Sequence, residues 1–130
     1  MGDKDFYNWH IAKQNMHEES SRSFFKEREV WFCRVGVNVG FEQDGSGDDF
    51  LRPVLVIKRF NKTVCWAVPL TRTNKKDARY YHPFQFKGDI SVAILSQLRL
   101  IDTKRLQYRA GIVDNDTFEG VRKKLRTLLS

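Results

Sequence analysis

Short apolar runs separated by turn-like polar clusters dominate the chain from residue 28 onward. Runs rich in β-branched and aromatic residues that stop at Gly, Pro, Asn or Asp are typical of strands. The tight Asn-Lys connection in "FNKT" (60–63) lies between two such runs and predicts an antiparallel hairpin. The pattern predicts six strands: "EVWFCRV" (29–35), "PVLVIKR" (53–59), "TVCWAVPL" (63–70), "RYYHPFQF" (79–86), "ISVAILS" (90–96) and "YRAGIV" (108–113).

Helical periodicity replaces this pattern at the C-terminus. The apolar positions there lie at i, i+3, i+7 and i+10: Phe118, Val121, Leu125 and Leu128. This spacing predicts a helix that buries one face. Asp116 with Glu119 approximates a capping box for its first turn. Within "IDTKRL" (101–106), Asp102 is placed to cap a single helical turn.

Residues 1–23 are predicted to form an N-terminal amphipathic helix and a polar linker. The positions at helical spacing are Phe6, Trp9, Ala12 or Lys13, and Met16. Asp3 or Asp5 can cap this helix, and "HEESSRS" (17–23) lacks periodicity. Residues 24–130 form the main domain. Many short strands with few helices predict a small closed or half-closed β-barrel, because closure removes sheet edges that would aggregate.

Composition restricts the class of protein without identifying it. A chain of 130 residues is long enough for one compact domain. No apolar run approaches the roughly 20 residues that span a bilayer, so we expect a soluble cytoplasmic protein. Cys33 and Cys65 lie inside apolar runs without metal-site spacing and are expected to be buried reduced thiols. The formal net charge of +7 favours an anionic partner, either nucleic acid or an acidic protein segment.

Recognisable catalytic motifs are absent from the sequence. It contains no GxxxxGK[ST], GxGxxG, HExxH or GxSxG pattern, so nucleotide-loop, zinc-protease and hydrolase-elbow chemistry have no support. His10 and His17 lie on or just after the N-terminal helix and are expected to be surface residues. His82 is followed by Pro83, which would fix its loop, and is therefore the stronger functional candidate.

Three sequence blocks together resemble the PemK/MazF family of toxins from type II toxin–antitoxin systems. They follow one another in the family's order over residues 28–107 and contain the patterns "GxNVGxEQ", "RPVLVI" and "SQxRxID". The blocks are "REVWFCRVGVNVGFEQDGSGDDFLRPVLVIKRF" (28–60), "VCWAVPLT" (64–71) and "SQLRLIDTKRL" (96–106). The resemblance implies an SH3-like β-barrel, so the expected fold is mainly β with short helices (α+β).

The same resemblance implies metal-independent cleavage of single-stranded RNA, with no cofactor, to 2′,3′-cyclic phosphate and 5′-hydroxyl ends. The family's catalytic arginine and threonine correspond to Arg52 and Thr71. A guanidinium can hold two phosphate oxygens and stays charged throughout the reaction, and Pro53 fixes the backbone that aims it. The other residues expected to bind RNA are Asn38, Glu42, Gln43, Arg72, His82 and Gln97.

The implied partners are a second copy of the chain and an antitoxin with an acidic, partly disordered segment, with operator DNA reached only through the antitoxin. Arg99 and Asp102 are expected to pair and brace the barrel. Ser96 departs from the family, because some members carry a carboxylate linked to catalysis there. The insert "DGSGDDFL" (44–51) also adds acidic residues that would repel RNA. Two alternatives remain open: a non-catalytic SH3-like module that binds nucleic acid or an acidic segment, and a degenerate toxin kept as an antitoxin partner.

Overall fold

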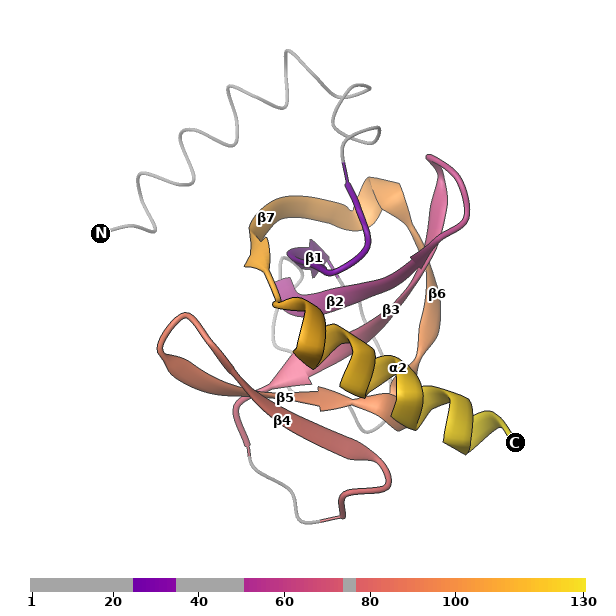
Figure 1. Ribbon diagram of the computed structural model, residues 1–130. Coiled ribbons are helices and arrows are strands. Elements are labelled where there is room, and N and C mark those ends of the chain that lie inside the picture. Colours follow the sequence, from indigo (N-terminus) through magenta and orange to yellow (C-terminus); the bar gives the residue numbers. More distant parts are fainter. Residues whose placement is uncertain (1–24, 35–50, 74–76) are drawn as a thin grey trace.

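The computed structural model describes residues 25–34, 51–73 and 77–130, which form an antiparallel sheet with one helix packed against it (Figure 1). The sheet order is β4-β5-β3-β2-β1-β7, and β6 pairs with β3. The elements are β1 (Glu29–Arg34), β2 (Leu51–Arg59), β3 (Val64–Thr71), β4 (Tyr81–Phe86), β5 (Asp89–Ile94), the 3₁₀ turn η3 (Leu95–Gln97), β6 (Arg99–Asp102), the 3₁₀ turn η4 (Thr103–Arg105), β7 (Leu106–Ile112) and α2 (Asn115–Leu129).

All six predicted strands are present, together with one strand that the pattern did not predict. The predicted hairpin joins β2 to β3, and Asn61 Oδ1 accepts hydrogen bonds from the backbone N–H groups of Thr63 and Val64. Asp102 caps η4 as expected, by accepting a hydrogen bond from the N–H of Lys104 at 2.8 Å. The unpredicted strand is β6, whose four residues lie between two 3₁₀ turns.

The C-terminal helix is confirmed, but its cap lies earlier than predicted. Asp114 is the N-cap, and its Oδ1 accepts a hydrogen bond from the N–H of Thr117 at 2.8 Å. Asp116 therefore lies inside the first turn, where its charge favours the helix dipole but cannot act as the cap. Phe118, Val121 and Leu125 are buried against the sheet, as the spacing predicted.

A proline marks the point where β3 changes its neighbour. Along one edge, β3 pairs with β6 at residues 64–67 and with β5 at residues 70–71. Pro69 lies in the gap between these two partners, where its missing N–H removes no hydrogen bond from either ladder. The chain can therefore divide here into the five strands that curl together and the hairpin β4–β5 that diverges from them.

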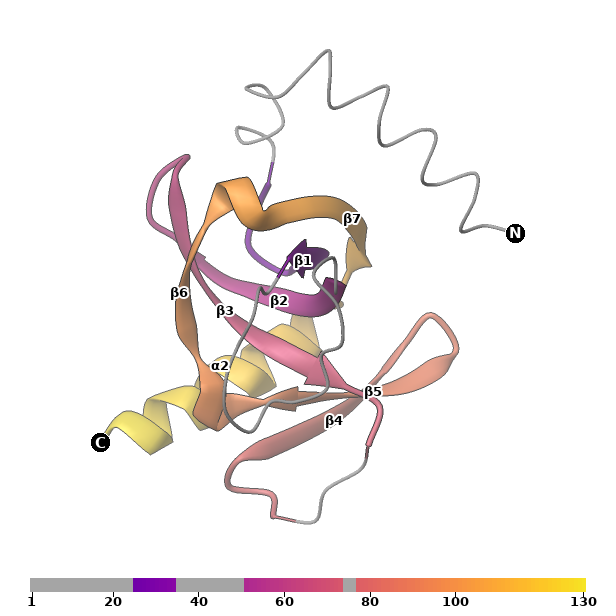
Figure 2. The ribbon, with the colours of Figure 1, turned by 180° about the vertical axis from the view of Figure 1, so that it is seen from behind.

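The described part of the sheet is open, so the closed form of the expected barrel is not present. Strands β4 and β7 form the two ends of the strand order, and no pairing joins them within residues 25–34, 51–73 and 77–130. The chain instead turns through η4 from β6 into β7, so that β7, β1, β2, β3 and β6 curve around one side (Figure 2). This is the half-closed alternative.

The two faces of the curled sheet bury side chains of different sizes. The inner face encloses many small residues, including Cys33, Val54, Val56, Cys65 and Ala67, together with Trp31, Phe25 and Ile101. The helix-side cluster contains larger residues, including Leu55, Ile57, Leu70, Phe84 and Leu95, together with Phe118 of α2. Small inner side chains let the strands curve tightly, while the larger ones fill the wider space beneath the helix. Alternate residues of β2 face the two clusters in turn.

The predicted N-terminal helix and its linker (residues 1–23) lie outside the described residues, so the helix remains a prediction. Cys33 and Cys65 are free and buried, as expected. No described helix is both long enough and apolar enough to cross a membrane.

Candidate functional site

Arg52 lies at the end of the inner face of the sheet. It opens the buried part of β2 and is two residues before Val54, so alternation directs it to the side of the inner cluster. Its partner in the β1–β2 ladder is Cys33, which belongs to the same cluster. Arg52 is therefore half-buried at the end of the inner face, just beyond the apolar residues of the inner cluster.

Thr71 reaches the same end of the inner face from β3. It follows Ala67 by four residues, and Ala67 contributes to the inner cluster. The β2–β3 register pairs Val54 with Pro69, and continuing that register by two residues places Arg52 opposite Thr71. The Thr71 hydroxyl oxygen accepts a hydrogen bond from the N–H of Thr73 at 3.3 Å, so the hydroxyl hydrogen is left for another acceptor.

Two more arginines approach this position. Arg99 of β6 pairs with Ala67 of β3, so its side chain projects on the inner side of the sheet. Burial raises the pKa of the Cys33 thiol to about 11, and the positive charges of Arg105 and Arg99 oppose that rise. Both guanidinium groups therefore lie near Cys33, the ladder partner of Arg52. We call Arg52, Thr71, Arg99 and Arg105 the inner-face site.

Within the described residues, no carboxylate forms a salt bridge with the arginines of this site. Across residues 25–34, 51–73 and 77–130, the salt bridges are formed by other arginines, namely Arg72, Arg79 and Arg109. Arg105 donates a hydrogen bond to the backbone carbonyl of Arg34 at 3.1 Å, which fixes its position without removing its charge. Three guanidinium groups and a hydroxyl donor at one end of a sheet can bind a phosphate group and its neighbours.

Comparison with known proteins identifies the family. Residues 26–129 match the model of the PemK-like, MazF-like toxin of type II toxin–antitoxin systems. The chain belongs to this family. The match covers all the described elements, from β1 to α2.

Solved structures of MazF proteins share the fold. MazF from Deinococcus radiodurans superposes with a TM-score of 0.67 at 22% identity, over 81% of this chain and 96% of the other. The MazE–MazF structure from the same organism gives 0.65 at 22% identity, over 81% and 95%. An endoribonuclease in complex with its cognate antitoxin from a mycobacterial species gives 0.61 at 16% identity, over 79% and 92%. No curated protein matches the sequence significantly.

The structure brings the two residues implied by PemK/MazF membership to one end of the inner face, but it does not gather every residue expected to bind RNA. Arg72 is exposed directly after β3 and pairs with Asp89 at 3.5 Å. Gln97 is exposed at the end of η3, two residues before Arg99. Asn38, Glu42 and Gln43 lie outside the described residues.

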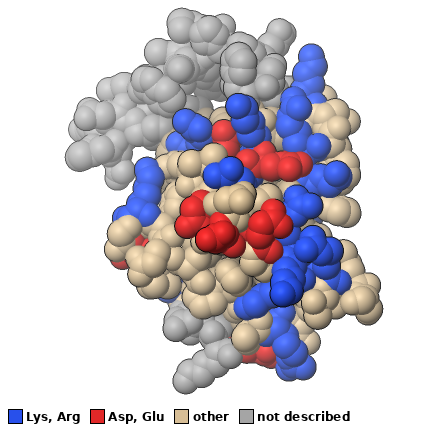
Figure 3. All heavy atoms as spheres, in the orientation of Figure 1, with Lys and Arg blue, Asp and Glu red and all other residues tan. Residues whose placement is uncertain are grey.

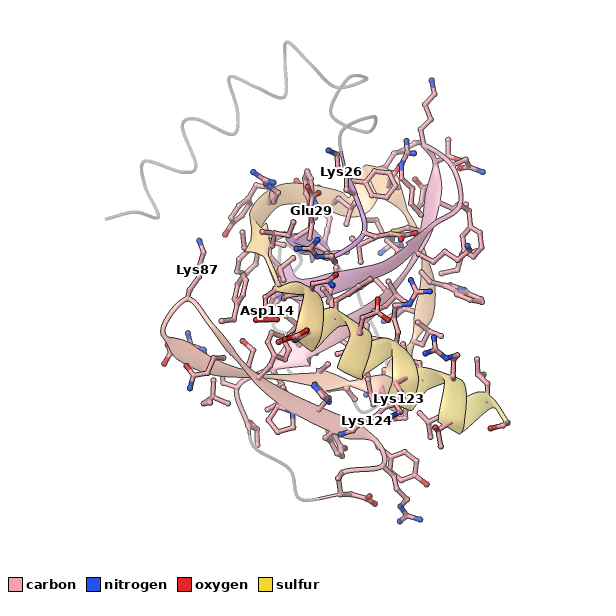
Figure 4. All side chains as sticks on the ribbon, in the orientation of Figure 1. Lys26, Glu29, Lys87, Asp114, Lys123 and Lys124 are labelled. Carbon is pink, nitrogen blue, oxygen red and sulfur yellow. The ribbon has the colours of Figure 1, made fainter. Side chains whose placement is uncertain are left out.

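His82 lies on the helix side of the sheet, away from Arg52. It pairs with Ala93, a member of the helix-side cluster, and its Cε1 would be 3.2 Å from a Cβ on Gly120 of α2. Its Nδ1 is buried without a hydrogen-bond partner. Burial lowers the pKa of His82, and the positive charge of Lys124, on the side of α2 toward β4 (Figure 4), lowers it further. These contacts indicate that His82 packs beneath α2.

The sequence pattern missed Arg99 and Arg105 as members of the site. The expected pairing of Arg99 with Asp102 is wrong, because residues three apart on a strand point to opposite faces. Asp102 caps η4 instead. The signal that could have found Arg99 was the alternation of "RLID", with Ile101 as its buried neighbour on the same face.

Proposed function

We propose that this PemK/MazF-family protein is a metal-independent toxin endoribonuclease that cleaves single-stranded RNA in the cytoplasm. The observation that carries the proposal is the meeting of Arg52 and Thr71 with Arg99 and Arg105 at one end of the inner face. Residues 24–130 form the catalytic domain in this proposal. Asn38, Glu42 and Gln43 would contribute further RNA contacts.

The reaction uses a nucleophile that belongs to the RNA. The 2′-hydroxyl oxygen attacks the adjacent phosphorus while losing its proton to a solvent water, and a 2′,3′-cyclic phosphate forms. The bond from phosphorus to the 5′-oxygen breaks, and that oxygen takes up a proton from solvent to become a 5′-hydroxyl. Arg52 binds the two non-bridging oxygens as their charge grows, and the Thr71 hydroxyl donates a hydrogen bond to one of them. Such preorganised donors stabilise the transition state more than the ground state.

Arg52→Ala tests this proposal most directly. Loss of one preorganised donor should lower kcat by a factor on the order of a hundred. Arg52→Lys should recover little of that loss, because an ammonium keeps the charge but cannot hold two oxygens in a planar fork. The assay incubates purified protein with mixed-sequence RNA in excess EDTA and maps both new ends.

Arg126→Ala is the matched control, since Arg126 is exposed on the last turn of α2, away from the inner face. It should cleave like the wild type. Cleavage by folded Arg52→Ala at the wild-type rate, or products with a 5′-phosphate, would refute the mechanism. RNA binding without cleavage by any variant would instead identify the non-catalytic module.

Thr71→Val replaces the Thr71 hydroxyl with a methyl group and leaves the side-chain volume almost unchanged. The variant should lower kcat, because the phosphate loses one donor, while the protein remains folded. Unchanged kcat would show that the Thr71 hydroxyl serves only the turn to Thr73. Circular dichroism and thermal unfolding report whether the fold survives.

We propose an acidic, partly disordered antitoxin segment as the protein partner, binding where RNA binds. The net charge of +7 supports this proposal. The arginines of the inner-face site would attract carboxylates as they attract phosphates. Figure 3 shows further Lys and Arg side chains on the side where the C-terminal half of α2 lies, outside that site. An acidic peptide should therefore displace fluorescent RNA competitively. Simultaneous binding of peptide and RNA would contradict a shared surface.

A homodimer is the proposed assembly. Phe60, Trp66 and Leu100 are exposed apolar residues, and Trp66 pairs with Leu100 across β3 and β6 while its ring meets the edge of Phe60. Such neighbouring apolar side chains favour burial against another surface. Sedimentation should give a dimer mass at micromolar concentration, and a monomer mass would refute this assembly.

A further inference from the structure

A pocket of about 670 Å³ opens on the helix side of the sheet, between β1 and β7 on one side and the β4–β5 hairpin on the other. It lies on the face opposite Arg52. Pro53, the next residue of β2, contributes to its wall. Its volume is within the range of ligand pockets, roughly 300 to 1,000 Å³. The pocket exists because the hairpin diverges from the curled strands where β3 changes partners.

Aromatic rings form the walls of the pocket, and contacts with one another and with the backbone fix their positions. The rings of Phe32 and Tyr108 stack with centroids 4.7 Å apart and planes at 19°. On the hairpin side, Phe86 approaches β7 so closely that a Cβ on Gly111 would lie 2.9 Å from its Cζ. The hairpin turns sharply at Lys87 and Gly88, both with positive φ, which fixes the position of Phe86.

Charged groups of both signs stand around these aromatic walls. Arg72 and Lys87 supply positive charge, and Lys87 is at the tip of the hairpin (Figure 4). Asp89 and Ser91 alternate with Ala93 of the helix-side cluster, so they project toward the same side as the pocket. Asp89 pairs with Arg72 at 3.5 Å, and both side chains are largely exposed to solvent. The pair can therefore exchange contacts with a ligand at little cost.

Thr71 connects the pocket to the inner-face site. It lines the pocket and also lies opposite Arg52 when the β2–β3 register is continued. A strand of RNA with its scissile phosphate at Arg52 can pass over this end of the sheet and place a neighbouring base in the pocket. Arg72 and Lys87 are then available to the phosphates of that nucleotide.

We propose that the pocket binds a guanine base of the RNA substrate and reads it through Asp89. This inference rests on the proposed ribonuclease function. An ionised carboxylate only accepts hydrogen bonds, and guanine presents two donors side by side, N1–H and the N2 amino group. Adenine and cytosine present an acceptor beside their amino group, and uracil presents one donor between two carbonyl oxygens. The aromatic walls supply stacking that any base can use, so Asp89 supplies the selection.

Binding of modified oligonucleotides tests the inference without cleavage. Hexamers with 2′-deoxy sugars lack the attacking hydroxyl, so wild-type protein binds them intact. A hexamer containing guanine should bind roughly tenfold more tightly than the same hexamer with hypoxanthine, which lacks the N2 amino group. Replacing guanine by 7-deazaguanine, which keeps both donors, should leave the affinity unchanged.

Asp89→Asn should abolish the difference between guanine and hypoxanthine, because the amide no longer offers two acceptors. Glu119→Gln is the matched control, since it removes one exposed carboxylate from α2 outside the pocket and should retain the discrimination. A 6-thioguanine placed at the selected position should photo-crosslink to peptides that contain Phe86 or Tyr108.

Two outcomes separate this inference from the proposed function. RNA that is cleaved equally well with guanine or hypoxanthine at every position, or a crosslink to peptides far from the pocket, overturns guanine recognition and leaves the ribonuclease intact. A protein that neither binds nor cleaves any RNA overturns both.

Discussion

Glu29→Ala should destabilise the protein strongly, because this carboxylate is 3% exposed and serves three donors. Oε1 accepts hydrogen bonds from the N–H of Lys26 at 2.8 Å and from Trp31 Nε1 at 2.9 Å. Oε2 pairs with Arg109 at 3.2 Å. The buried indole N–H would lose a charged acceptor and gain no water, which costs about 1 to 3 kcal/mol. With the Lys26 bond, we expect a total of about 3 kcal/mol, or a Tm lower by about 10 °C.

Glu29→Gln is the matched control, since the two oxygens have separate partners. The amide oxygen can replace Oε1 and keep both hydrogen bonds, so only the pair with Arg109 is lost. The Arg109 side chain is 54% exposed, and such a pair contributes less than about 1 kcal/mol. In a Trp31→Phe background, Glu29→Ala should cost at least about 1 kcal/mol less. Equal losses for Gln and Ala in urea unfolding would refute the assignment of the stability to Oε1.

Three further predictions follow from buried or constrained groups. Burial raises the pKa of Cys33 to about 11 and that of Cys65 to about 12, so iodoacetamide at pH 8 should alkylate both thiols far more slowly in native than in urea-unfolded protein; equal rates by mass spectrometry would contradict their burial. Burial lowers the pKa of His82 in the folded protein, so the unfolded chain binds a proton at this residue first as the pH falls below about 6.5. The free energy of unfolding should therefore be greatest above that pH and decrease below it. The decrease should be smaller in His82→Gln. Gly88 has φ +84°, so Gly88→Ala should cost about 1 kcal/mol in thermal unfolding, and no loss would contradict the left-handed turn.

Local signals predicted most of the strands because their determinants lie within each segment. The β2–β3 hairpin follows from "FNKT" and the apolar runs beside it, and Asn61 holds the turn. Strand β6 has only four residues and is stabilised by pairing with β3, which lies more than 30 residues away along the sequence. A strand that depends on a distant partner leaves little trace in its own pattern. The opening of the sheet also has a non-local cause, because it depends on which distant strands pair, and the described strands β4 and β7 do not.

The candidate site was predictable only in part, for related reasons. Arg52 and Thr71 came from family resemblance, since an arginine before a strand has no distinctive pattern of its own. Arg99 and Arg105 join them only after β6 has paired with β3 and η4 has turned the chain into β7. His82 drew attention because of the following Pro83, but Pro83 is exposed on the end strand β4, where a missing N–H is tolerated. Pro83 is therefore explained by the position of β4 at the end of the sheet, and it is no evidence for a functional role of His82.

The register of β2 decides where both proposed functions lie. Successive residues Arg52 and Pro53 face the inner-face site and the helix-side pocket, respectively. A slip of one residue would exchange them. Both faces of β2 are buried, so alternation of polar and apolar residues does not prevent such a slip. Side-chain size does: the valines of "VLVI" (54–57) fit the tightly curved inner face, whereas its leucine and isoleucine fill the wider space beneath α2. The slipped strand would crowd one cluster and leave voids in the other, each costing on the order of 1 kcal/mol or more per side chain. Packing on two sides thus holds the arginine on the inner face, which is the condition for its proposed role on the phosphate.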